Sequence, residues 1–177
     1  MDRAIFLDRD GTLNDDVGYL KHPAELILFP ETLAALKRLQ PHFRFFIVTN
    51  QPCIAEGIVT ANDVDRVNAG LVADLSREGI RIEKVFVCPH TRAQGCQCVK
   101  PNPHFLHRAA AEFGIDLARS FVIGDHPHDV ELARSVGATG VYVLTGHGAK
   151  HRDNVRPDVV ITRHIGEAAD HVLSLLR

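Results

Sequence analysis

The sequence lacks a strong net charge and a long hydrophobic run. Its 20 basic and 22 acidic residues leave a net charge of −2, so nothing in the composition favours a nucleic acid or another polyanion as a partner. No stretch approaches the roughly 20 apolar residues that a membrane-spanning helix needs, and the first residues lack the apolar core and the cleavage site of a leader peptide. We therefore expect a cytoplasmic protein that contacts neither nucleic acid nor membrane.

The sequence also has no internal repeat and no low-complexity segment. Hydrophobic residues make up 45% of the chain and charged residues 24%, a balance that argues against disorder. The length of 177 residues suits one domain with one sizeable core. We expect a single domain over residues 1–177. The sequence gives no oligomeric state, and a monomer is compatible with it.

Short apolar runs alternate with segments of helical periodicity. Because neighbouring parallel strands require crossover connections, this alternation predicts an α/β fold, a doubly wound parallel sheet with helices on both faces and no separate cap domain. Residues 15–29 have no clear period and are expected to form a loop or flap near the ligand crevice, and 145–156 a second loop. Strands are predicted at 5–7, 43–48, 85–87, 121–123, 141–144 and 159–161, and helices at 30–40, 61–78, 103–113, from within 125–129 to 136, and 165–176.

Two carboxylates one residue apart, Asp8 and Asp10, follow the first apolar run. Strand ends in an open α/β sheet face the crevice where ligands bind, and Gly11 permits a sharp turn. Because an unpaired carboxylate at the end of a buried strand is costly, the pair predicts a bound cation, a hydrogen-bond network, or both. The alternative is an ordinary solvated turn, since Asp and Gly are common turn residues.

Other predicted strands also end in polar side chains. Thr49, Asn50 and Gln51 follow the second apolar run, and Asp125 follows the fourth. Together with Lys100, these groups suit Mg²⁺, which prefers a few carboxylates with water and phosphate oxygens, and a phosphoryl group whose charge is neutralised by the cation and the lysine. An aspartate can be the nucleophile in such chemistry.

Three cysteines and one histidine cluster within a short segment, at Cys88, His90, Cys96 and Cys98. Three sulfurs and one imidazole are the ligand composition of a closed tetrahedral zinc site. We expect a structural zinc in a loop at about 88–100 that delivers Lys100. The alternative is a set of small, buried, apolar cysteines. Cys53 stands apart and is expected to be a free thiol.

In their order and spacing, four short motifs resemble those of the haloacid dehalogenase (HAD) superfamily of aspartate-nucleophile phosphatases: Asp8-Arg9-Asp10-Gly11-Thr12, Thr49-Asn50-Gln51, Lys100-Pro101, and Gly124-Asp125 with Asp129. The resemblance implies that Asp8 is the nucleophile and that Asp10 is the general acid and base. It implies that Mg²⁺ is held by the Asp8 and Asp125 side chains and the Asp10 backbone carbonyl. Thr49 and Lys100 would bind the phosphoryl oxygens, and Asp129 would orient Lys100 or the metal waters. The alternative for Asp129 is an acid that stabilises a helix N-terminus.

The zinc loop narrows the resemblance to the subset that contains heptose bisphosphate phosphatases and histidinol phosphatases. The segment 49–57 and the flap at Gly18-Tyr19 are closer to the heptose enzymes. This implies a small phosphorylated sugar as substrate, with histidinol phosphate or another small metabolite as the alternative. Tyr19, Asn50 and Gln51 would then bind the substrate.

Several positions depart from the heptose pattern, namely Pro52, Cys53, Glu56, Val99, His104 and His126. Val99 stands where that pattern has an arginine. The chain therefore lacks a guanidinium group that could bind a second phosphate with two hydrogen bonds. Arg92 and His126 are candidates to replace that arginine.

Two hypotheses from other classes stay open at this point. A receiver-like signalling module also combines Asp, Thr, Lys and Mg²⁺, but the second acid, Asp10, argues against stable storage of a phosphoryl group because it is poised to activate water. A zinc-stabilised binding module without chemistry would leave the acidic strand ends without a role.

Overall fold

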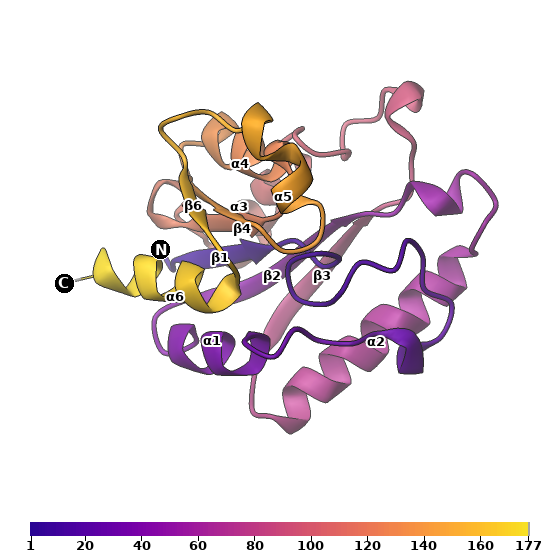
Figure 1. The fold of residues 1–177 in the computed structure, drawn as a ribbon, viewed down its shortest axis with the longest axis horizontal. Coiled ribbons are helices and arrows are strands. Elements are labelled where there is room, and N and C mark those ends of the chain that lie inside the picture. Colours follow the sequence, from indigo (N-terminus) through magenta and orange to yellow (C-terminus); the bar gives the residue numbers. More distant parts are fainter. Residues whose placement is uncertain (177) are drawn as a thin grey trace.

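A parallel sheet lies between two layers of helices in the computed structural model, which describes residues 1–176 (Figure 1). Its six strands are β1 (Ala4–Leu7), β2 (Arg44–Asn50), β3 (Ile82–Cys88), β4 (Phe121–Gly124), β5 (Thr139–Val143) and β6 (Val160–Thr162). The helices are α1 (Thr32–Leu39), α2 (Ala61–Arg77), α3 (His104–Phe113), α4 (Pro127–Ser135), α5 (Gly148–His151) and α6 (Ile165–Ser174). The predicted fold class is confirmed.

The strand order is β3-β2-β1-β4-β5-β6, and every neighbouring pair is parallel. The chain winds outward in one direction from β1 through β2 to β3 and in the other direction from β4 to β6. In open α/β sheets, ligands bind beyond the carboxyl ends of the strands at the point where the winding changes direction. That point is the end of β1, where Asp8 and Asp10 follow the strand.

Side chains of each strand alternate between two hydrophobic cores because successive residues of a strand point to opposite faces. Ile5 and Leu7 pack with residues of α1, α2 and α6, whereas Phe6 packs with residues of α3 and α4. Figure 1 shows these two helix layers on opposite sides of the sheet. Burial of β1 on both faces holds its carboxyl end firmly in the middle of the molecule.

Some element boundaries differ from those predicted. The helix expected from residue 30 begins at Thr32, whose hydroxyl donates to the Leu13 carbonyl (2.8 Å). β3 begins at Ile82 rather than at 85. It is an edge strand whose first residues are only partly buried, so these residues need not be apolar and the apolar run in the sequence is shorter than the strand. The predicted loop 145–156 contains the short helix α5.

The flap at residues 15–29 is closed at its base and supported in its middle. Asp15 donates its backbone N–H to the Ile27 carbonyl (2.9 Å), and the short turn Pro23–Glu25 lies against α2 at Gly70. A Cβ atom at Gly70 would lie 2.6 Å from the Pro23 Cβ atom, so only glycine lets the flap approach α2 this closely.

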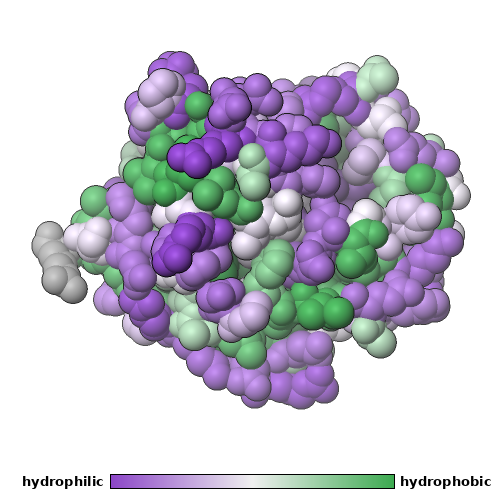
Figure 2. Space-filling view, viewed as in Figure 1, coloured by the Kyte–Doolittle hydropathy of each residue, from purple (hydrophilic) through white to green (hydrophobic). Residues whose placement is uncertain are grey.

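The surface is predominantly hydrophilic on the face that Figure 2 shows, where hydrophobic residues form separate patches. Within residues 1–176, no helix has both the length and the apolar character that crossing a membrane requires.

Truncation of a core residue tests the packing of α1 on the sheet. Leu36 is completely buried, and Leu36→Ala is expected to lower the free energy of unfolding by about 2–5 kcal/mol through lost burial and a residual cavity. Urea denaturation measures the change. Leu175→Ala removes the same atoms from a side chain that is 54% exposed and should change stability by less than about 0.5 kcal/mol. Equal losses in the two variants would contradict the assignment of Leu36 to the core.

Candidate functional site

A cavity of about 400 Å³ opens at the carboxyl ends of the central strands. It is lined by side chains from the ends of β1, β2 and β4, from the flap, and from the loop that follows β3. Every predicted site residue outside the cysteine cluster lines this cavity, namely Asp8, Asp10, Tyr19, Thr49, Asn50, Gln51, Lys100, Asp125, His126 and Asp129.

Lys100 forms two ion pairs at the floor of the cavity. Its Nζ atom lies 2.7 Å from Asp8 Oδ1 and 2.7 Å from Asp129 Oδ1. Burial, the largest effect, raises the pKa of Asp8 to about 6, although the charge of Lys100 opposes this rise. Burial alone would lower the pKa of Lys100, but the carboxylates of Asp129 and Asp8 outweigh it and raise that pKa above its usual value. Lys100 therefore stays protonated at neutral pH.

Asp129 has both of the contacts that its two hypotheses require. While Oδ1 pairs with Lys100, Oδ2 accepts a hydrogen bond from the backbone N–H of His126 (3.0 Å) at the start of α4. The carboxylate thus stabilises the helix N-terminus and holds the lysine at the same time. Gly124 makes room for it, because a Cβ atom there would lie 2.2 Å from the Asp129 carboxylate.

Three carboxylates crowd around one edge of this network. Asp8, Asp125 and Asp129 each place an oxygen within 4.8 Å of the other two. Burial and the nearby Asp8 and Asp129 charges raise the pKa of Asp125 to about 9. Oxygen ligands that repel one another in this way are stabilised by a hard divalent cation, so the donor set fits Mg²⁺. A Cβ atom at Gly11 would lie 2.1 Å from Asp125 Oδ2, which explains the glycine beside these oxygens.

Asp10 lies outside this carboxylate group and belongs to a separate hydrogen-bond network. Arg9 grips it with two bonds, Nη2 to Oδ2 (2.7 Å) and Nε to Oδ1 (3.1 Å). Asn14 and Gln51 donate to the two carboxylate oxygens, at 3.0 and 2.7 Å. Arg9 is only 1% exposed, and its Nη1 atom also donates to Asn68 Oδ1 on α2 (2.8 Å). The Asp10 carboxylate is therefore fixed in one orientation.

Arg9, Asn14 and Asn68 were not predicted from the sequence as site residues. A signal for Asn68 was present, because it is a polar residue on the face of α2 that Val64 and Leu71 make apolar. Arg9 has no comparable local signal, since its partner on α2 lies 59 residues away. Asp16, His128 and His147 also line the cavity and were not predicted.

The end of β2 contacts both networks. Gln51 Nε2 donates to Thr49 Oγ1 (2.9 Å) as well as to Asp10, and the backbone N–H of Lys100 donates to Asn50 Oδ1 (3.2 Å). Thr49 is buried, whereas Tyr19 is 52% exposed at the cavity rim. The residues at the end of β2 thus connect Asp10 and Lys100 through hydrogen bonds. Tyr19 lies at the open side of the cavity.

The positions that depart from the heptose pattern fall into two groups. Pro52, Cys53, Glu56 and His126 line the cavity. Val99 is instead buried in the core beneath α3, and His104 begins α3 with its ring against Phe105. Only the first group can contact a ligand in the cavity directly.

Histidines gather where α4 begins. His126 Nδ1 and His128 Nδ1 lie 2.5 Å apart, and the His151 ring lies 4.9 Å from the His126 ring. Burial and the neighbouring histidines lower the pKa of His126 to about 4. The His126 imidazole is therefore mainly neutral at pH 7 and acts as a hydrogen-bonding group rather than as a charge.

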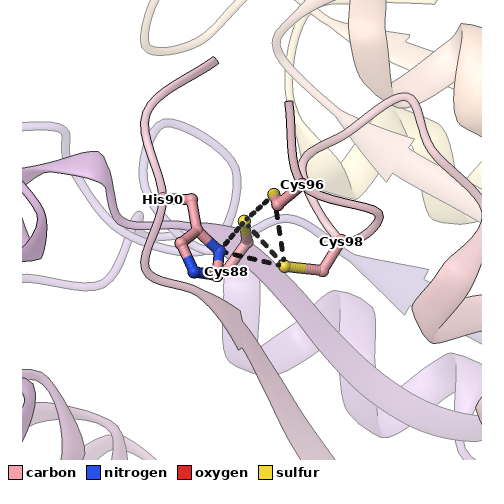
Figure 3. Close-up of side chains that lie close together, drawn as sticks. All are labelled: Cys88, His90, Cys96 and Cys98. Atoms are coloured by element: carbon pink, nitrogen blue, oxygen red, sulfur yellow. Dashed lines mark hydrogen bonds between the residues drawn. The ribbon is translucent and has the colours of Figure 1, made fainter. Parts of the chain in front are cut away.

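The three clustered cysteines and His90 converge on one point in the loop after β3 (Figure 3). The sulfur of Cys88 lies 3.1 Å from that of Cys98 and 3.5 Å from that of Cys96, and Cys98 lies 3.5 Å from His90 Nδ1. These separations are too long for a disulfide. They are close to the spacing of about 3.8 Å between sulfurs that Zn–S bonds of about 2.3 Å give in a tetrahedron.

The cysteine cluster is connected to Lys100 through the backbone. Arg92, in the short turn Arg92–Gln94 between His90 and Cys96, donates from Nη2 to the Lys100 carbonyl (3.0 Å). Asn102 Nδ2 donates to the Cys96 carbonyl (2.9 Å). The geometry of this loop therefore helps to position the lysine. Cys53 lies apart from the cluster as a free thiol.

Comparison with known proteins gives consistent matches. The family model described as HAD-hydrolase-like matches residues 97–168. A probable D-glycero-D-manno-heptose-1,7-bisphosphate 7-phosphatase of Thermoplasma acidophilum is 36% identical over 76% of this chain and 86% of that protein. The D-glycero-beta-D-manno-heptose-1,7-bisphosphate 7-phosphatase of Pseudomonas aeruginosa is 34% identical over 82% of this chain and 83% of its own.

A solved structure is similar over nearly the whole chain. The D,D-heptose 1,7-bisphosphate phosphatase from B. bronchiseptica, complexed with magnesium and phosphate, superposes with a TM-score of 0.89 at 29% identity and covers 98% of this chain and 99% of its own.

The crowded carboxylates predict a pH dependence of stability without Mg²⁺. The pKa of Asp125 is about 9 in the folded protein and 3.8 ordinarily, so between these two pH values only the folded protein holds the proton. Raising the pH through this window should lower the free energy of unfolding by up to about 1.4 kcal/mol per pH unit.

Urea denaturation at several pH values measures this slope. Asp125→Asn, which has no proton to lose there, should show a flatter dependence. Parallel curves for the two proteins would contradict the raised pKa.

Proposed function

Since the chain belongs to the HAD-like hydrolases and is a phosphatase, we propose that it cleaves a small sugar phosphate with an aspartate nucleophile and Mg²⁺. The first candidate substrate is D-glycero-D-manno-heptose 1,7-bisphosphate, cleaved at the 7-phosphate. The observation that carries this proposal is the convergence of Asp8, Asp125 and Asp129 around Lys100 at the carboxyl edge of the sheet. The names of the heptose phosphatase relatives support the substrate.

Asp8 is the proposed nucleophile. Its carboxylate attacks phosphorus, an acyl phosphate forms, and the bond from phosphorus to the sugar oxygen breaks. Asp10 gives its proton to that oxygen and then takes a proton from the water that cleaves the acyl phosphate, which releases phosphate and restores Asp8. The fixed orientation of Asp10 by Arg9, Asn14 and Gln51 supports this role.

The charge on the phosphoryl oxygens needs neutralisation. Lys100, kept protonated by its two carboxylate partners, supplies a permanent cation, and Thr49 supplies a hydroxyl donor at the end of β2. Asp8, Asp125 and the backbone carbonyl of Asp10 would hold Mg²⁺, which supplies further positive charge to the phosphoryl oxygens when bound. Asp129 orients Lys100 through their ion pair.

We further propose that Cys88, His90, Cys96 and Cys98 hold a structural zinc ion. The composition and spacing of the four ligand atoms support it. The ion would fix the loop whose backbone leads directly to Lys100, so zinc would maintain the catalytic geometry from outside the cavity.

Histidinol phosphate or another small phosphate monoester is the second candidate substrate. Four positions that depart from the heptose pattern line the cavity, namely Pro52, Cys53, Glu56 and His126, so the cavity wall differs from the one that this pattern implies. The receiver-like alternative has less support, since the relatives are named phosphatases.

Removal of the proposed nucleophile tests the reaction. Asp8→Asn should reduce phosphate release from heptose 1,7-bisphosphate and from histidinol phosphate, in the presence of Mg²⁺, by on the order of a thousandfold or more, because no acyl phosphate can form. The matched variant Asp65→Asn alters an exposed aspartate of α2 and should retain activity. Substantial turnover by folded Asp8→Asn protein would rule out this nucleophile.

Metal analysis tests the second ion. Protein purified with its thiols reduced should contain about one zinc per chain, and Cys98→Ser should lose most of it, since three ligands hold zinc less tightly than four. Cys53→Ser, which removes a thiol outside the cluster, should keep the zinc. Equal zinc contents in both variants, or none in the unmodified protein, would contradict the site.

A further inference from the structure

Arg92 contributes an unneutralised positive charge to the cavity. It lines the cavity wall from the turn between His90 and Cys96, and it takes part in none of the ion pairs formed within residues 1–176. The other permanent cation of the wall, Lys100, is already paired with two carboxylates. An arginine that faces a cavity without a carboxylate partner is suited to an anionic ligand.

The Arg92 guanidinium is also held in place. One N–H group, on Nη2, donates to the Lys100 carbonyl (3.0 Å). A guanidinium has five N–H donors in a planar fork, so the remaining donors are available to a ligand. Because this contact already restricts the side chain, less conformational entropy is lost when an anion binds.

The charges around the cavity favour an anion on the Arg92 side. Asp16 is engaged by His147 (3.0 Å), whereas Glu56 has no ion-pair partner within residues 1–176 and lies on the connection after β2. Burial is the main cause that lowers the pKa of His128, and the positive charge of Arg92 adds to this effect. An anion is therefore attracted to Arg92 and repelled from Glu56.

We propose that Arg92 forms a second anion subsite, for a phosphate or carboxylate of the substrate other than the phosphate that is cleaved. This rests on the proposed phosphatase function. Lys100 separates the two positions, since its Nζ atom meets Asp8 while its backbone carbonyl meets Arg92. The substrate would thus have two anionic groups, separated by roughly the length of a lysine side chain.

A pair of substrates that differ by one phosphate tests this assignment. The probes are heptose 1,7-bisphosphate and heptose 7-phosphate, and the measurement is kcat/KM for release of the 7-phosphate. Arg92→Gln should lower kcat/KM for the bisphosphate by about tenfold to a hundredfold, mainly through KM, as expected for loss of a charge-assisted contact. Its kcat/KM for the monophosphate should stay within about twofold of the unmodified protein's value.

Controls separate binding from structural damage. Arg119→Gln removes the same charge from an exposed side chain in the turn before β4, at the opposite edge of the sheet, and should leave both constants unchanged. Zinc content equal to that of the unmodified protein shows that the Arg92→Gln loop is intact.

Each other outcome contradicts the proposal in a recognisable way. An equal loss for both substrates would mean that Arg92 only positions Lys100. No loss for either would mean that it binds no substrate group. Hydrolysis that is faster for a substrate with a remote ammonium, and sensitive to Glu56→Gln, would assign recognition to the acidic wall instead. Absence of phosphate release from any ester by the unmodified protein would instead contradict the proposed function itself.

Discussion

The site depends on one buried interaction, the contact of Lys100 with Asp8 and Asp129. Each partner comes from a different segment: Asp8 follows β1, Lys100 ends the loop after β3, and Asp129 lies in the first turn of α4. Burying any one of these charges alone would be strongly unfavourable. Each of the three segments therefore stabilises the positions of the other two, so these buried charges also constrain the fold around the cavity.

Further hydrogen bonds connect these three residues to the surrounding elements. Asp129 connects the lysine to the start of α4, Asn50 connects it to β2, and Arg92 connects it to the cysteine cluster. Zinc in that cluster would act on Lys100 through the backbone that follows Cys98 and through the Arg92 hydrogen bond. The Asp10 network is attached elsewhere, through Arg9 to Asn68 on α2, so the two acids that follow β1 are supported by different parts of the molecule.

Much of this arrangement was predictable because its signals are local. Apolar runs that end in Asp8, Thr49 and Asp125 marked strand ends, and parallel strands bring their carboxyl ends to one edge. The cysteine spacing likewise marked one loop. Contacts between distant segments gave no such signal: the Arg9 interaction with Asn68, the packing of Val99 in the core, and the presence of His128 in the cavity depend on how the layers meet. The roles of the individual site residues stay predictions until variants are measured.

The anchored flap has a consequence for how the cavity exchanges its contents. The Asp15–Ile27 hydrogen bond closes the base of the segment, and its middle rests on Gly70 of α2 through Pro23. Only the few residues around Gly18 and Tyr19 are free of these supports. Local backbone rotations in such a short stretch occur on the nanosecond to microsecond scale, faster than the collective motion of domains. Passage of a small molecule into or out of the cavity past this stretch would then require no rearrangement of the sheet or of either helix layer.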